Sequence, residues 1–213
     1  MSVPFAVDAD LARVVRPGVL WWDGVSVAAH APAIDAELDA VVAGVVAAPP
    51  ADTHTVREMY RRIGLDPTKT RPSNEALLRR VRRGDAFPRV NSLVDAVNLC
   101  SLQFQLPYGV YDRAALAGAI TLRLGRDGEA YAGIRKDAVH VAGRVTVADG
   151  TGPFGNPTSD SFRAMVTTST RDALVVIFAP LVTSTADLTR VLDMTAIRVA
   201  HTCGGAERQR WVA

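Results

Sequence analysis

Cysteine is scarce in this chain of 213 residues, and Cys100 and Cys203 lie far apart without CxxC spacing. This scarcity excludes a disulfide framework and a zinc knuckle, and it indicates free thiols in a reducing compartment. The four histidines are scattered singly, without HxxxH or HExxH spacing. We therefore expect no metal site and no cofactor.

Long apolar runs and a basic N-terminal segment are absent as well. No run approaches the ~20 apolar residues that span a bilayer. The opening residues, MSVPFAVDADLARVV, lack the basic region that begins a secretory signal. These absences predict a soluble, cytoplasmic protein that has no membrane partner.

Net charge is nearly absent, because 24 Lys and Arg residues face 22 Asp and Glu residues and leave a formal charge of +2. A net charge of this size is too small to indicate a nucleic-acid partner by itself. The distribution of the charges along the chain is more informative. Residues 57–89 contain ten basic and four acidic residues, which is a local basic excess. This segment is a candidate for contact with RNA, although a basic helix is also often an ordinary solvated face.

The composition is that of a globular chain, with 48% hydrophobic and 22% charged residues, and the length suits one domain. We expect an α/β (α+β-like) fold in which flanking helices cover a mixed β-sheet. The prolines of AAPPADTH break the pattern near residue 50. Residues 1–50 are expected to be an N-terminal α/β lead-in packed on a main domain of residues 51–213.

Strands are expected where apolar residues alternate or cluster. In the lead-in we predict strands at 19–22 and 25–30 around the turn at Asp23-Gly24. Residues 120–134 read as a hairpin that turns at Asp127-Gly128. An apolar strand is predicted from residue 173 and a helix over residues 186–201.

A helix predicted over residues 74–83 carries the basic segment's densest charge. Ser73 is its expected N-cap, and Leu77, Leu78 and Val81 form its inward stripe. The exposed arc then carries the arginines expected to bind RNA phosphates, which are Arg79, Arg80, Arg82 and Arg83.

The next predicted helix, residues 93–104, begins after Ser92, and Asp95 suggests a variant capping box. Asn91, Asp95 and Asn98 are spaced by four and three residues, so they form a row beside the apolar face, with Ser101 near it. Such a row suggests a lined pocket. Ordinary capping and buried hydrogen bonding would give the same pattern.

Two segments in this region resemble a known module. RVNSLVDAVNLCSLQFQLPYGVYD and TVADGTGPFGNPTSDSFRAMVTTSTRDALVVIFAP are similar to the B3/B4 module of the bacterial phenylalanyl-tRNA synthetase β subunit. The upstream YRRIGLDPTKTRPSNEALLRRV is more typical of free-standing proteins of this family. The resemblance implies a single B3/B4-like domain without an aminoacylation core. It also implies an editing site that hydrolyses the ester of tyrosine mischarged onto phenylalanine tRNA.

The resemblance also suggests which residues form the site. Asn98 falls on an asparagine of the family's site, whereas Gly109 and Met165 stand where the family has a histidine and a glutamate. Candidates to replace these lost groups are Ser159, Asp160 and Arg163. The expected substrate pocket therefore comprises Asn91, Asn98, Ser101, Tyr108, Ser159, Asp160 and Arg163, with no catalytic residue assigned.

Two functional hypotheses follow. The first is a trans-acting deacylase that binds tRNA and removes a mischarged amino acid. The second is a binder without catalysis, which holds structured RNA or a free amino acid in a degenerate editing pocket. The residues at positions 109 and 165 favour the second hypothesis, and neither requires DNA as a partner.

Overall fold

The computed structural model describes residues 4–48, 54–134 and 136–213. The predicted boundary at residue 50 lies outside the described residues, so the division into a lead-in and a main domain stays a prediction. Of the N-terminal strands, β1 (Phe5–Val7) joins one sheet and β2 (Val15–Asp23) joins another.

Ten strands and five α-helices make up the described part of the chain. The helices are α1 (Asp35–Ala47), α2 (His54–Arg62), α3 (Ser73–Arg82), α4 (Ser92–Phe104) and α5 (Thr185–Cys203). The strands that follow β2 are β3 (Tyr108–Asp112), β4 (Ile120–Leu124), β5 (Ala130–Gly133), β6 (Lys136–His140), β7 (Val145–Asp149), β8 (Gly152–Gly155), β9 (Asp172–Pro180) and β10 (Ala206–Val212). None of the described helices is long and apolar enough to cross a membrane.

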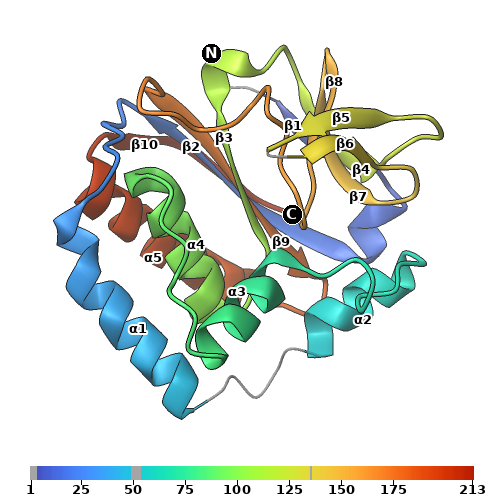
Figure 1. Ribbon diagram of the computed structural model, residues 1–213. Coiled ribbons are helices and arrows are strands. Elements are labelled where there is room, and N and C mark those ends of the chain that lie inside the picture. The colour runs from blue at the N-terminus through green and yellow to red at the C-terminus, as the bar shows by residue number, and fades with distance from the viewer. Residues whose placement is uncertain (1–3, 49–53, 135) are drawn as a thin grey trace.

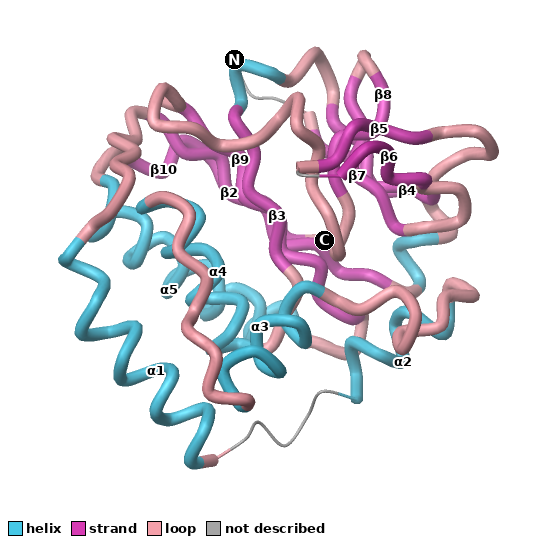
Figure 2. Tube along the Cα trace, in the orientation of Figure 1, coloured by secondary structure: helices cyan, strands magenta, loops and turns pink. Residues whose placement is uncertain are grey.

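An antiparallel sheet in the order β10-β2-β9-β3 forms the centre of the molecule. Strands β2 and β9 pair over nine residues, from Val15 opposite Pro180 to Asp23 opposite Asp172. Figures 1 and 2 show α1, α3, α4 and α5 on one side of this sheet and the smaller strands on the other. Because β9 is covered on both faces, its residues 173–180 are all buried. Helices therefore flank the sheet as expected, and the expected mixed pairing occurs in a second sheet, where β1 runs parallel to β4.

The smaller strands form two further sheets. The first has the order β1-β4-β7-β8, with β1 parallel to β4 and the other pairs antiparallel, and the second consists of β5 and β6. The predicted hairpin over residues 120–134 is therefore wrong. Its turn at Asp127-Gly128 exists, but β4 pairs with β1 and β7 while β5 pairs with β6. The buried side chain of Leu122 holds β4 in the core beside Val147, which gives β4 a longer-range partner than β5.

The strand predicted over residues 25–30 is also wrong, because its backbone bonds to loops and side chains. The amide of Val25 donates to the carbonyl of Arg171, that of Ser26 to Cys203, and that of Ala28 to the Ser92 hydroxyl. Helices α3, α4 and α5 begin and end within two residues of their predicted bounds, whereas strands such as β3 and β10 were not predicted. Helix α3 begins after Pro72 without a side-chain cap, and Asn91 rather than Ser92 caps α4.

Strand β3 is the last strand of the central sheet, and its alternation sends side chains to both faces. The Tyr108 hydroxyl hydrogen-bonds the Thr195 hydroxyl of α5 at 3.0 Å. On the opposite face, the Tyr111 ring packs edge-on against Phe154 of β8, with 4.8 Å between ring centroids. The Tyr111 hydroxyl lies between two glycines, since a Cβ would be 2.1 Å from it at Gly109 and 2.2 Å from it at Gly155. The position of Tyr111 thus depends on both glycines.

We expect Gly109→Ala and Gly155→Ala each to lower the free energy of unfolding by about 1–3 kcal/mol, because the added methyl group overlaps the buried Tyr111 ring. Urea unfolding of each variant measures this change. Gly44→Ala is the matched control, since a Cβ at this position of α1 meets nothing within 4 Å and should be neutral or stabilising. A Gly109→Ala midpoint equal to that of the wild type would contradict this packing.

Candidate functional site

A groove of about 430 Å³ runs along the outer face of α3. The inner face of the helix fits the predicted stripe, because Leu77, Leu78 and Val81 are buried in an apolar cluster with Leu99 and Leu102 of α4. The groove is lined by Arg71, Ser73, Ala76, Leu77, Arg79, Arg80, Arg83, Pro88, Asn98 and Thr158. Three of the four predicted arginines therefore share one groove with Arg71, while Arg82 is exposed outside its lining.

The loop before β9 forms the other wall of this groove. The amide of Ser73 donates to the carbonyl of Pro157 at 3.0 Å, which fastens the start of α3 to this loop. The Thr158 hydroxyl hydrogen-bonds Tyr60 of α2, also at 3.0 Å. Both walls are thus held by bonds to neighbouring elements.

Positive charge exceeds negative charge in the groove. The Arg79 guanidinium has no hydrogen-bond or ion-pair partner among the described residues, and Nε of Arg80 donates only to the carbonyl of Ala86. Arg83 pairs with the exposed Asp85 at 2.9 Å. The Glu75 carboxylate near Arg71 is buried and already makes a two-pronged pair with Arg57. Guanidinium groups arranged in this way are suited to bind phosphate.

A second cavity, of about 230 Å³, lies at the free edge of β3. Its walls come from α4, β3, the turn after β5 and the segment 160–166. The lining residues are Val90, Val94, Val97, Asn98, Tyr108, Val110, Ile134, Asp160, Met165 and Val166. Seven of these ten side chains are aliphatic, so this is an apolar cavity with a few polar groups.

Asn98 lines both the basic groove and the apolar cavity. It is half-buried on α4, and its side chain makes no hydrogen bond to any residue that the structure describes. A polar group without a partner at the junction of two cavities can donate to a ligand and accept from it. Asn98 belongs to the polar row that the sequence pattern placed beside a pocket, and here it lines both spaces.

Asn91 and Ser101 support the walls of the site and do not line either cavity. The Asn91 side chain accepts from the amide of Val94 and donates to the carbonyl of Val166, which connects the start of α4 to the segment across the cavity. The Ser101 hydroxyl donates to the carbonyl of Leu106 at 2.7 Å and is buried. Both side chains therefore hydrogen-bond backbone groups, which is the alternative to a ligand role that the sequence left open.

Ser159 and Arg163 also lie outside the cavity lining. The carbonyl of Ser159 accepts from the Tyr131 hydroxyl. Arg163 pairs with Asp149 at 3.0 Å and lies over the Phe154 ring. Of the seven predicted pocket residues, the structure thus brings together Asn98, Tyr108 and Asp160.

The backbone around Asp160 is fixed by short bridges to two neighbouring strands. Asp160 forms an isolated β-bridge with Gly155, and its backbone carbonyl accepts from the amide of Ile134 at 3.2 Å. The adjacent Ser161 pairs with Gly133 and is fully buried. These bridges bring Asp160 and Ile134 to the same wall of the cavity.

The Asp160 carboxyl group is chemically unusual. Its Oδ1 atom is buried without a hydrogen-bond partner among the described residues, as is the hydroxyl oxygen of Tyr111. Burial raises the pKa of the Asp160 carboxyl to about 7, and the neighbouring Tyr111 hydroxyl opposes that rise. Burial also raises the pKa of the phenols of Tyr111 and Tyr108 well above the usual value. The phenols therefore stay protonated near neutral pH, and the carboxyl group alone titrates there.

Most of the cavity wall was not identified from the sequence. Val90, Val94 and Val97 precede or lie on α4, but Ile134 and Val166 come from connections that carry no pocket signal. Met165, which the resemblance aligned with a glutamate, does line the cavity. At residue 109, which the resemblance aligned with a histidine, the Tyr111 hydroxyl occupies the space that a side chain would fill.

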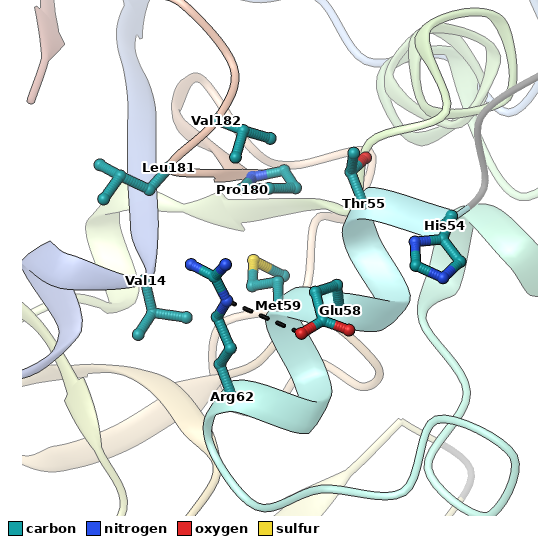
Figure 3. Close-up of a pocket in the computed structure, with 9 residues that line it drawn as sticks. All are labelled: Val14, His54, Thr55, Glu58, Met59, Arg62, Pro180, Leu181 and Val182. Atoms are coloured by element: carbon teal, nitrogen blue, oxygen red, sulfur yellow. Dashed lines mark ion pairs between the residues drawn. The ribbon is translucent and has the colours of Figure 1, made fainter.

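A third, smaller cavity of about 90 Å³ lies between α2 and the end of β9 (Figure 3). Apolar side chains such as Met59 and Val182 form much of its wall, and Glu58 and Arg62 form an ion pair with 3.8 Å between Nε and Oε1. No group of His, Cys, Asp and Glu side chains suited to a metal occurs among the described residues. Because Asn98 lines both the groove and the apolar cavity, we take these two spaces together as the candidate site.

Titration of Asp160 predicts a specific pH dependence of stability. Its folded-state pKa of about 7 exceeds the unfolded value of ~3.9, so between these values the native state binds more protons than the unfolded state. The carboxyl group thus lowers the free energy of unfolding as pH rises through this window. We therefore compare the free energy of unfolding of Asp160→Asn with that of the wild type at each pH. This difference should favour the variant more at about pH 7.5 than at about pH 4.5.

Thermal melting at these two pH values measures the effect. Asp127→Asn is the control, because Asp127 is exposed at a turn and its substitution should leave the pH dependence unchanged. Parallel melting curves for Asp160→Asn and the wild type across this range would show that Asp160 is not a buried carboxyl group.

The chain can be compared with known proteins by its structure and by its sequence. The chain is similar to an N-terminal fragment of the phenylalanyl-tRNA synthetase β subunit from Pyrococcus horikoshii, with 12% identity and a TM-score of 0.57. The alignment covers the whole of this chain and 55% of that one, so this chain spans about half of its length. At this identity the likeness shows the fold alone. No curated protein matches the chain.

The family model described as the B3/4 domain matches residues 55–196. This range holds α3, α4, β3 and the segment 160–166, and hence the residues that line the groove and the cavity. The match covers more than half of the sequence and confirms the resemblance drawn from the sequence segments. The chain therefore belongs to the B3/4 domain family.

Proposed function

We propose that this chain binds tRNA and acts as a trans-acting editing factor, which hydrolyses the ester of a mischarged aminoacyl-tRNA. The observation that carries the proposal is that Asn98 lines both the arginine groove and the apolar cavity. The end of an aminoacyl-tRNA needs such a junction, because its terminal ribose carries the amino-acid ester and is also linked to the phosphate backbone. The fold shared with a fragment of a phenylalanyl-tRNA synthetase β subunit supports the same reading.

In this proposal Arg71, Arg79, Arg80 and Arg83 bind phosphates of the acceptor strand. The amino-acid side chain enters the apolar cavity, and the ester lies near Asn98. The water oxygen adds to the ester carbonyl carbon, and the bond from that carbon to the ribose oxygen then breaks. The ribose oxygen takes up a proton, and the products are the free amino acid and uncharged tRNA.

Positioning supplies much of the rate in such a reaction, since the ester is already activated and the vicinal ribose hydroxyl can assist the attacking water. The Asn98 amide can donate to the carbonyl oxygen as negative charge develops on it. The proposal places the protein in the cytoplasm, where tRNA is charged.

A second candidate is a binder of RNA or of an amino acid that does not catalyse hydrolysis. The lining of the apolar cavity favours it, because it includes no histidine, cysteine, serine or glutamate among the described residues. The two functions differ in turnover. A hydrolase accelerates loss of the ester at substoichiometric amounts, whereas a binder slows this loss or leaves it unchanged.

Replacing groove arginines tests the RNA interface. We expect Arg79→Gln with Arg83→Gln to weaken tRNA binding and to flatten its salt dependence. The slope of log K against log salt should fall by roughly 0.7–0.9 for each phosphate that the variant no longer neutralises, because fewer counterions are released. Fluorescence anisotropy with labelled tRNA over a salt series measures this slope.

The matched control is Arg82→Gln with Arg126→Gln, which removes the same charge from exposed positions outside the groove. It should retain the wild-type slope. Equal slopes for both double variants would exclude the groove as the phosphate-binding surface.

Deacylation of a panel of mischarged tRNAs by catalytic amounts of the chain tests the reaction. We expect acceleration for one amino acid and tRNA pair, and a loss of about 10²-fold in rate for Asn98→Ala, the usual cost of removing one oxyanion donor. Asn98→Ala should melt as the wild type does, because the side chain makes no hydrogen bond to the described residues. No acceleration across a broad panel would contradict the editing function and favour the binder.

A further inference from the structure

The apolar cavity combines a wide aliphatic wall with a single carboxyl group. Its seven aliphatic lining residues come from residues 90–97, β3, the turn after β5 and residues 165–166, and Asp160 is the only acidic residue of the lining. The lining includes no arginine, lysine or histidine among the described residues. A ligand seated in this cavity therefore meets one anionic group and otherwise mainly hydrocarbon.

We propose that the cavity selects an α-amino acid with an apolar side chain that lacks a hydroxyl group, and that Asp160 pairs with the α-ammonium group. This inference rests on the proposed function, since it names the amino acid that the site accepts. Three independent features of the cavity support it, which are the partnerless carboxyl oxygen, the chemistry of the wall and the size of the enclosed space.

The first feature is the Asp160 carboxyl. Oδ1 is buried and has no hydrogen-bond partner among the described residues. A buried carboxylate without a partner is unfavourable, and a cation placed beside it removes that cost. An ammonium group beside the carboxyl group offsets that cost with its charge and keeps donors for Asn98. The Asp160 carboxyl is thus the one anionic group of the lining that a ligand cation meets.

The second feature is the wall itself. Val94, Val97, Val110, Ile134 and Met165 present methyl and thioether groups, against which an aliphatic or phenyl side chain gains about 25 cal/mol for each Å² it buries. A hydroxyl group buried against these side chains would find no hydrogen-bond partner among them.

With Asp160 paired to the α-ammonium group, the other polar groups of the lining are poorly placed to recognise a side-chain hydroxyl. The Tyr108 hydroxyl is bonded to Thr195, whose own hydroxyl donates to the carbonyl of Val191. Asn98 lies at the junction with the arginine groove, where the ester is expected. The interior of the cavity is therefore suited to an apolar side chain.

The third feature is size. The volume of about 230 Å³ exceeds the ~150 Å³ of an engineered protein cavity that binds benzene. It is smaller than the ~300 Å³ at which pockets for drug-sized ligands begin. A side chain from the size of valine to that of a benzyl group fits this range, with room for the ammonium group.

Ionisation of Asp160 makes this binding depend on pH. The titratable groups that act on its carboxyl are the phenols of Tyr111 and Tyr131, both of which stay protonated near neutral pH because burial raises their pKa. Ammonium binding should strengthen as pH rises through the Asp160 pKa of about 7. It should weaken again above ~8, where an α-amino group loses its proton.

Amino-acid amides test the proposal on the full chain without tRNA, because an amide keeps the α-ammonium group and replaces the ester with a neutral group. Calorimetric titration should show L-leucinamide or L-phenylalaninamide binding at least ~10-fold more tightly than N-acetyl-L-leucinamide, which has no ammonium group. L-Phenylalaninamide should bind more tightly than L-tyrosinamide by about 10- to 100-fold, the range over which an apolar pocket rejects an added hydroxyl.

Asp160→Asn should remove the advantage of L-leucinamide over its N-acetyl form, and Asp127→Asn should retain it. Equal binding of the two leucine amides to the wild type, tighter binding of L-tyrosinamide, or no binding of any amide would each overturn the proposal. The wild-type comparison stands even where Asp160→Asn does not fold. Active deacylation with failed amide selectivity would reject this inference alone, whereas amide selectivity without deacylation would reject only the hydrolytic function.

Discussion

The pairing of β3 with β9 is the contact on which the candidate site depends. Strand β9 lies between β2 and β3, so β3 is the last strand of the central sheet and has one free edge. The segment 160–166 approaches that edge, where the amide of Asp112 donates to the carbonyl of Ala164. Helix α4 covers the adjacent face. An additional strand beyond β3 would fill the space that forms the apolar cavity.

Helix α4 connects this cavity to the basic groove, and buried polar contacts hold the helix in place. Arg198 of α5 is almost fully buried and donates to Sγ of Cys100 at 2.9 Å and to Gln103 at 2.7 Å. Burial raises the pKa of the Cys100 thiol, so this thiol serves packing rather than nucleophilic chemistry. A rigid helix keeps Asn98 at a constant position between the basic groove and the apolar cavity, which is the preorganisation that the proposed hydrolysis by positioning would require.

The Asp160 carboxyl and the Tyr111 hydroxyl depart from the rule that buried polar groups are paired. Tyr111 occupies the space beside Gly109, and Met165 adds to the apolar wall of the cavity.

The sequence by itself determined the fold class, the helix positions and the family, because helical periodicity and the segments flanking Asn98 are local signals. It also predicted the arginine face of α3, since Leu77, Leu78 and Val81 define the opposite face. Only the tertiary structure decided which strands pair, because β4 and β5 have the same pattern whether they form a hairpin or join separate sheets. It alone separated Asn98 and Asp160 from Asn91, Ser101, Ser159 and Arg163. The physical reason is that a cavity wall such as that of Ile134 and Val97 joins residues far apart in the chain, and local spacing carries no information about such contacts.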